Sequence, residues 1–127
     1  MTTERLKTKR IGFVGAGNMA EAILRGLLES GSSPADRVAA CDVDFARRRH
    51  MIDTHGIAME ESGRRLVKRC DVVVLAVKPQ VISEVLDEIG PVLGPEKLVI
   101  SVVGGLTVGS IRSRVPKGTR IVRTMPN

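Results

Sequence analysis

The segment IGFVGAGNMA, residues 11–20, decides the fold of this 127-residue chain. Its first four residues form an apolar run that ends at a glycine, which predicts a short buried strand. From Asn18 to Ser30 the apolar residues recur at helical spacing, and Gly31 suits the end of a helix. A strand that passes through a glycine-rich turn into a helix is typical of the first unit of a parallel sheet.

The turn between that strand and that helix reads Gly15-Ala16-Gly17-Asn18-Met19-Ala20, which fits the pattern G-x-G-x-x-A. The first glycine permits the tight turn, and the second lets a phosphate approach the backbone. Alanine in the third position still allows the helix to pack closely on the strand. The free amides of the first helical turn and the positive end of the helix dipole attract an anion. The sequence therefore predicts that this turn holds the pyrophosphate of NAD or NADP.

Strand and helix patterns alternate along the rest of the chain. Further strands are predicted at Val38–Cys41, Ile57–Met59, Asp71–Val77, Leu98–Val102 and Arg120–Arg123. Helices are predicted at Phe45–His55, at Gly63–Arg69 with Ser62 as its cap, after Pro79 up to Gly90, and from Thr107 to Arg114. This alternation predicts an α/β fold, a Rossmann-like doubly wound parallel sheet of about six strands in the order 3-2-1-4-5-6, with helices on both faces.

The ends of the chain set the expected domain limits. Residues 1–9 are polar and predict a flexible N-terminal tail. Residues 10–127 contain no internal linker, so we expect one dinucleotide-binding domain there.

Composition narrows the classes of partner. The net charge is +6, and an excess of positive charge can indicate a nucleic-acid partner. Proteins that bind single strands usually add aromatic stacking platforms, yet this chain has no Trp or Tyr and two Phe. We therefore expect solvated basic faces and an anionic cofactor, with no nucleic acid as partner. No apolar run approaches the ~18 residues of a membrane span, so we also expect no membrane partner.

The two cysteines, Cys41 and Cys70, each border an apolar run. Their separation does not match a metal-binding or redox pair, so we expect small buried side chains and no metal site. Two lone thiols fit a reducing compartment. The N-terminus also lacks the apolar stretch of a signal peptide, and together these features predict a cytoplasmic protein.

Asp42 follows the second predicted strand, roughly 20 residues past the glycine turn, where an acidic residue binds the ribose 2′-hydroxyl of NAD. Arg47 and Arg48 come within the next helical turn and suit the 2′-phosphate of NADP. Asp42 therefore favours NAD, and the arginines leave NADP open. In the alternative interpretation, Asp42 serves only as a loop or cap residue.

Several segments together resemble the pyrroline-5-carboxylate reductases. They are residues 11–23, Ala76-Val-Lys-Pro-Gln80, residues 101–105 and Arg123-Thr-Met-Pro-Asn127. Many dehydrogenases share the glycine turn, whereas the Ala-Val-Lys-Pro-Gln stretch and the final Met-Pro-Asn are more specific. The resemblance implies a domain that binds NADPH or NADH for the reduction of 1-pyrroline-5-carboxylate to L-proline, a step of proline biosynthesis.

The resemblance also implies site residues. The cofactor contacts beyond the glycine turn would come from Ala76, Val77, Lys78, Pro79 and Gly104. On the substrate side it implies Lys78, Met125 and Asn127, although a lysine here can equally be solvated or hold a loop carbonyl. No catalytic residue is expected, because the cofactor carries the hydride and the protein orients it.

This chain departs from the family pattern in several places. Asp42-Val43 stands where members often have Ser, Thr or Asn-Arg, Gly63 stands where they often have Asn, and Val103-Gly104-Gly105 replaces an alanine-rich turn. The family also carries a C-terminal helical domain that forms the dimer and most of the substrate site. We therefore expect the imino-acid substrate and a homo-oligomer only in a full-length enzyme. These 127 residues are expected to bind cofactor without turning over substrate.

Two alternatives stay open at this point. One is a stand-alone dinucleotide-binding module. The other is the cofactor domain of a deazaflavin-dependent NADP oxidoreductase or of a 3-hydroxyacid dehydrogenase, because these enzymes share the glycine turn.

Overall fold

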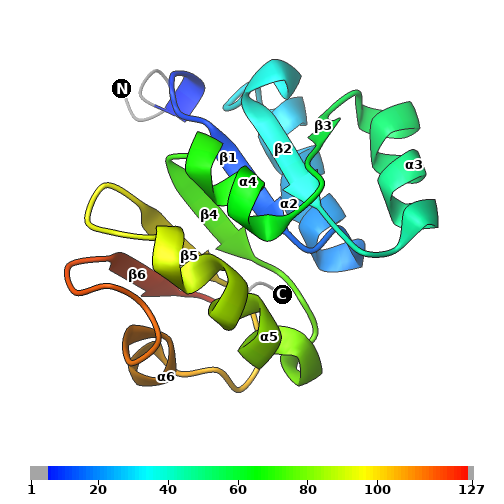
Figure 1. Cartoon of the computed structure of the whole chain (residues 1–127). Helices are drawn as coiled ribbons and strands as arrows, with labels where there is room; N and C mark the ends of the chain where they lie inside the picture. The colour runs from blue at the N-terminus through cyan, green and yellow to red at the C-terminus, as the bar shows by residue number, and fades with distance from the viewer. Residues whose placement is uncertain (1–5, 126–127) are drawn as a thin grey trace.

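The computed structural model describes residues 6–125, in which strands and helices alternate around one parallel sheet (Figure 1). The sheet has six strands in the order β3-β2-β1-β4-β5-β6. The strands are β1 (Ile11–Val14), β2 (Val38–Cys41), β3 (Ala58–Met59), β4 (Val72–Leu75), β5 (Leu98–Ser101) and β6 (Arg120–Arg123). Every neighbouring pair is parallel. The predicted doubly wound Rossmann-like order is therefore confirmed.

Helices connect the strands and cover both faces of the sheet. The α-helices are α2 (Asn18–Glu29), α3 (Phe45–His55), α4 (Gly63–Arg69), α5 (Ile82–Ile89) and α6 (Val108–Arg112). Short 3₁₀ turns add η1 (Ala35–Arg37), η2 (Pro79–Val81) and η3 (Gly90–Val92). Figure 1 shows α4 and α5 in front of the sheet and α2 behind it.

Alternating strand residues supply two separate hydrophobic layers. On β1, Phe13 points to the layer under α2 and α3, while Val14 points to the layer under α4, α5 and α6. Leu24 of α2 and Leu66 of α4 are fully buried, one in each layer. Apart from Phe13, the buried residues of both layers are non-aromatic, as the near absence of aromatic residues predicts. Burial of both faces explains why the strands in the middle of the sheet, β1, β2 and β4, are apolar throughout.

Several boundaries differ from the predicted ones. The run predicted as a strand over residues 71–77 pairs in the sheet only over Val72–Leu75. Its apolar pattern continues because Val77 packs against the layer under α4 and α5 without joining the ladder. The helix predicted after Pro79 is also divided, since Pro79–Val81 form a 3₁₀ turn before α5.

The first and last residues of the chain lie outside the described part. Within it, Leu6 and Lys7 are helical, and Leu6 packs against the layer under α2. The tail predicted for residues 1–9 stays a prediction, because residues 1–5 are not described. Among the described helices, none has the length and apolar character that crossing a membrane would require.

Candidate functional site

The glycine turn runs from the end of β1 into α2 and is shaped by Gly15. Its φ is +103°, a conformation that side-chain-bearing residues rarely adopt. A Cβ at this position would lie 2.7 Å from the carbonyl oxygen of Ala76. The Gly15 amide also donates to the carbonyl of Cys41, 2.9 Å away. Gly15 therefore lets the turn fit tightly between the ends of β2 and β4.

Gly17 has a different role, because it stands immediately before α2. A Cβ built on Gly17 would meet nothing within 4 Å. As at any helix start, the first amides of α2 have no intrahelical partners, and here no side chain caps them. Ala20 is completely buried, in keeping with the need for a small residue where helix and strand touch. The start of α2 thus presents helix-end amides to open space, an arrangement suited to an anion.

Asp42 fastens this turn to the loop after β2. Its Oδ2 accepts a hydrogen bond from the Ala16 amide at 2.7 Å, and its Oδ1 accepts one from the Asp44 amide at 2.8 Å. Each carboxylate oxygen therefore already has a backbone donor. These hydrogen bonds correspond to the loop role that the sequence offered as an alternative, while Asp42 also lines the cleft, so its contact with a ribose stays a prediction.

Arg47 and Arg48 of α3 differ in their contacts. Arg47 donates from Nε to the Ala16 carbonyl at 2.7 Å and from Nη2 to Glu21 Oε1 at 2.9 Å. The Arg48 guanidinium lies over the Phe45 ring, 5.7 Å from its centroid. No carboxylate among the described residues forms a salt bridge with Arg48. Arg47 is therefore part of the framework of the turn, while Arg48 keeps its charge available to a ligand.

A cleft of about 940 Å³ opens over the turn. Most of the predicted cofactor residues line it, together with both arginines: Gly15, Gly17, Asn18, Asp42, Arg47, Arg48, Ala76, Val77 and Lys78. Other predicted residues do not line it, namely Ala16, Met19, Ala20, Pro79, Gly104 and Met125. Ala16 and Ala20 are buried beneath the turn, and Gly104 and Met125 are exposed elsewhere. Asn127 lies outside the described residues.

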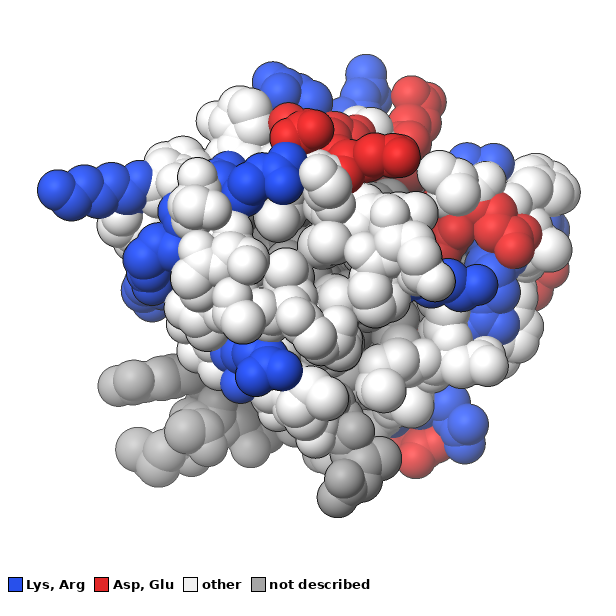
Figure 2. Space-filling view, turned by 90° about the horizontal axis from the view of Figure 1, so that it is seen from below, with Lys and Arg blue, Asp and Glu red and all other residues white. Residues whose placement is uncertain are grey.

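The opposite wall of the cleft was not predicted. Its residues are Glu61, Ser62 and Gly63 at the start of α4, with Val81, Glu84, Val85 and Glu88 from η2 and α5. Seen from below the view of Figure 1, one group of acidic side chains lies at the upper edge of the surface, and others lie at the right and lower right (Figure 2). In sequence, glutamates on an amphipathic helix are most simply explained as a solvated face. Only the fold shows that Glu84 and Glu88 border a cleft.

Gly63 explains one departure from the family pattern. Its amide donates to Glu88 Oε2 at 3.2 Å. A Cβ at this position would lie 2.8 Å from Cγ2 of Ile89. The packing of α4 on α5 therefore leaves no room for an asparagine side chain here unless Ile89 or Glu88 shifts.

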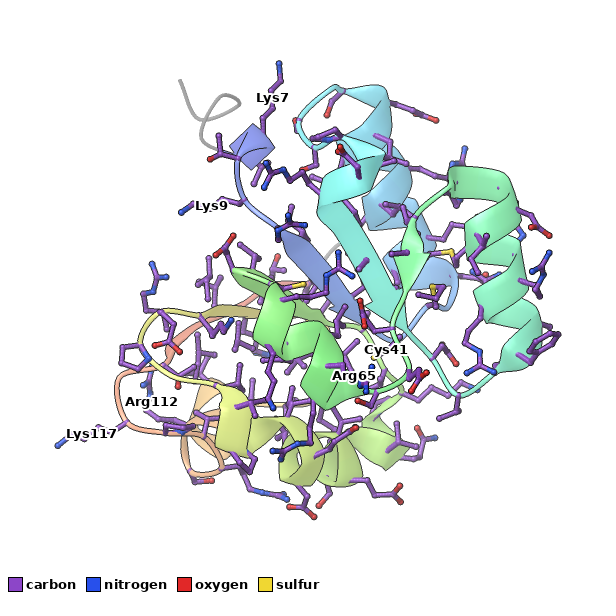
Figure 3. All side chains as sticks on the ribbon, turned by 45° about the horizontal axis from the view of Figure 1, so that its top comes forward. Lys7, Lys9, Cys41, Arg65, Arg112 and Lys117 are labelled. Atoms are coloured by element: carbon purple, nitrogen blue, oxygen red, sulfur yellow. The ribbon has the colours of Figure 1, made fainter. Side chains whose placement is uncertain are left out.

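Cys41 and Cys70 are unpaired and buried, which confirms the prediction of small buried side chains. Burial raises the pKa of the Cys41 thiol to about 12 and that of Cys70 to about 11. In Figure 3, Cys41 lies within the fold, whereas Lys7 and Lys9 project from the N-terminal segment and Lys117 projects from a loop far from them. The labelled basic residues are thus dispersed, and they do not form one continuous stripe.

Comparison with known proteins identifies the family of this chain. The family described as NADP oxidoreductase, coenzyme F420-dependent, matches residues 10–105. Pyrroline-5-carboxylate reductase 3 of Rattus norvegicus is 36% identical to this chain, over 100% of the chain and 46% of the relative. The chain thus spans less than half the length of such curated relatives.

Solved structures give the same result. A pyrroline-5-carboxylate reductase from Coxiella burnetii matches with a TM-score of 0.87 at 36% identity, over 94% of this chain and 44% of that one. The Plasmodium falciparum pyrroline carboxylate reductase, solved with NADP bound, matches with a TM-score of 0.83 at 29% identity, over 96% and 44%. These matches confirm the predicted resemblance. Coenzyme F420 is a deazaflavin, so the family description shares its name with one of the alternatives, but the relatives at 36% identity are pyrroline-5-carboxylate reductases and do not favour that alternative. The chain belongs to the family of NADP oxidoreductases described as coenzyme F420-dependent, and along its length it is similar to the N-terminal half of pyrroline-5-carboxylate reductases.

Proposed function

We propose that this chain is the cofactor-binding half of an enzyme that reduces 1-pyrroline-5-carboxylate to L-proline with NADPH. The observation that carries the proposal is the open space over Gly17 and the first turn of α2, inside the large cleft. The similarity to reductases of this name supplies the reaction. The imino-acid substrate and a homo-oligomer belong to a protein that also contains a counterpart of the relatives' second half.

The described residues fit a nicotinamide dinucleotide. The amides of the first α2 turn suit the pyrophosphate, because no side chain caps them and Gly17 leaves room for close approach. Asp42 and Arg47 keep this turn in place through hydrogen bonds to the backbone of Ala16. Ala76, Val77 and Lys78 extend the wall toward the nicotinamide side. When bound, the cofactor supplies the hydride, and the chain holds and orients it.

NADP is the form of cofactor that we propose. Both Asp42 oxygens already accept backbone hydrogen bonds, so this carboxylate has a structural role that does not require a ribose hydroxyl. Arg48 lines the cleft without a carboxylate partner among the described residues, so its charge can offset that of a 2′-phosphate. The Plasmodium falciparum relative, solved with NADP, supports the same choice.

A nucleotide-fluorescence titration tests this proposal. The chain has no Trp or Tyr, so protein emission does not overlap the reduced nicotinamide signal. We expect NADPH to bind more tightly than NADH. Arg48→Ala should weaken NADPH binding roughly tenfold or more, since a hydrogen bond to a charged group contributes about 1.5–3 kcal/mol, and should change NADH binding little.

Arg49→Ala is the matched control, because Arg49 is on the same helix and pairs with Asp53 outside the cleft. It removes the same charge and should leave both affinities unchanged. Tighter binding of NADH than of NADPH would overturn the choice of NADP and return Asp42 to the ribose. Failure of both nucleotides to bind would overturn the cofactor site itself.

A further inference from the structure

Three side chains from α2 and α3 meet at one point behind the glycine turn. Glu21 Oε2 lies 2.6 Å from His50 Nε2 and 2.8 Å from His55 Nε2. Exposure is low for Glu21, at 17%, and for His55, at 10%, while His50 is 39% exposed. The chain contains no other histidines. Both imidazoles therefore converge on a single carboxylate oxygen that lies largely away from solvent.

Neighbouring groups hold these side chains in orientation. The Arg47 guanidinium forms a salt bridge with the Glu21 carboxylate. Arg47 contacts the other oxygen, Oε1, and leaves Oε2 to the histidines. Thr54 Oγ1 lies 3.3 Å from His50 Nδ1. A hydrogen bond at Nδ1 is the usual way in which a metal-binding imidazole is oriented with Nε2 toward the ion.

We propose that Glu21, His50 and His55 form a binding site for a divalent transition-metal ion of the zinc class. Two imidazole nitrogens and a carboxylate oxygen are a ligand set that zinc accepts, with water in the remaining position. One ligand atom from each residue lies within 4.8 Å of the others. Tetrahedral ligands about 2.0 Å from zinc are roughly 3.3 Å apart. The two short contacts would therefore need to widen by about 0.5 to 0.7 Å, and partly exposed His50 leaves a side open to water.

The site would connect two elements of the cofactor cleft without forming part of it. Glu21 is in the first half of α2, and both histidines belong to α3. Arg47 connects the cluster to the glycine turn, because it contacts both Glu21 and the Ala16 carbonyl. A bound ion would tie α3 to α2 and stabilise the folded chain. This inference is independent of the proposed reductase function, because no cluster residue lines the cleft.

Cobalt and zinc titrations of the untagged chain test the site. Co²⁺ should produce the intense visible bands of a four- or five-coordinate ion, without the near-ultraviolet thiolate band that cysteine ligands would cause. Zn²⁺ should displace it and should raise the Tm, and EDTA should reverse that rise. Glu21→Gln, His50→Ala and His55→Ala should each weaken Co²⁺ binding at least tenfold. Thr54→Ala leaves all ligands in place and should weaken binding by roughly ten- to a hundredfold.

Asp53→Asn is the control, because it removes a carboxylate on the same helix that pairs with Arg49 away from the cluster. It should bind Co²⁺ as the unaltered chain does. The proposal is overturned if the unaltered chain gives only the pale spectrum of hydrated Co²⁺ and no zinc-dependent change in Tm. In that case the cluster is a set of hydrogen bonds alone. It is also overturned if binding survives in the three ligand variants, which would place the ion elsewhere.

Discussion

At the scale of single residues, a substitution at Gly17 should weaken cofactor binding and leave the stability of the fold nearly unchanged. A methyl group at this position would meet no protein atom within 4 Å, so Gly17→Ala should leave the Tm nearly unchanged. The same methyl would project into the space that the pyrophosphate needs against the backbone. We expect NADPH affinity to fall at least tenfold, as measured by fluorescence titration beside a thermal melt.

Gly15→Ala is the variant to compare with Gly17→Ala, because it should lower the stability of the fold. Gly15 has φ +103°, and an added Cβ would lie 2.7 Å from the Ala76 carbonyl oxygen. We expect this variant to lose about 1–3 kcal/mol of unfolding free energy, the usual range for a strained backbone position. If Gly17→Ala is the less stable of the two variants, or binds NADPH normally, the assignment of these roles is wrong.

Cys41 should be unreactive although it borders the cleft. Burial raises the pKa of its thiol to about 12, so the reactive thiolate is scarce at pH 8. We expect iodoacetamide to label Cys41 in the folded chain roughly a thousandfold more slowly than in urea, because the thiolate fraction differs by about that factor. Mass spectrometry distinguishes Cys41 from Cys70. Similar rates in the folded and unfolded states would contradict the buried environment.

The sequence alone could predict those parts of the candidate site that lie within one short segment of the chain. The glycine turn could be predicted because its residues are consecutive and their spacing follows from backbone geometry. The Glu21–His50–His55 cluster could not be predicted, because its members lie on two helices and the sequence does not show how these helices pack. Asp42 was located correctly at the end of β2. Its hydrogen bonds to the Ala16 and Asp44 amides depend on the fold and appear only in the structure.

At the scale of elements, α3 depends on its N-terminal cap. Only Met51 of this helix is buried, so packing contributes little to its stability. Asp44 accepts hydrogen bonds from the amides of Ala46 and Arg47, at 2.9 and 3.3 Å. Asp44→Ala should therefore cost about 1 kcal/mol, the typical value for loss of a cap, measured by urea unfolding.

Asp44→Asn is the matched test of that cap. Asparagine caps helices about as well as aspartate, so this variant should retain most of the stability and lose only the small dipole contribution. Equal destabilisation by alanine and asparagine would show that the negative charge of Asp44 stabilises the helix and that its cap hydrogen bonds do not.

Element order was predictable because most strands are apolar runs and the helices between them show helical spacing of apolar residues; β6, with arginine at both ends, is the exception. The boundaries of the strands and helices were less predictable. The apolar run to Val77 continues past β4 because Val77 packs against the layer under α4 and α5 after the chain has left the ladder. Likewise, Pro79 was expected inside the first turn of one helix. The structure instead has a 3₁₀ turn there and starts α5 at Ile82.

At the scale of the whole molecule, the described residues provide a cofactor cleft without a complete substrate site. Among the residues expected on the substrate side, Lys78 lines the cleft and is exposed, while Met125 is 60% exposed outside it. The curated and solved relatives are more than twice as long as the part that this chain matches. We therefore expect the described residues to provide few contacts to an imino acid beside the nicotinamide.

We expect this chain to bind NADPH and yet to oxidise none of it when 1-pyrroline-5-carboxylate is added. The physical reason is that hydride transfer requires the acceptor carbon to be held within contact distance of the nicotinamide, and orientation supplies a large part of the rate. The assay follows loss of reduced-nucleotide absorbance, with a full-length relative such as the Coxiella burnetii enzyme as positive control. Turnover by the 127 residues alone would show that the cleft wall around Lys78 and Glu84 is itself enough to position the substrate.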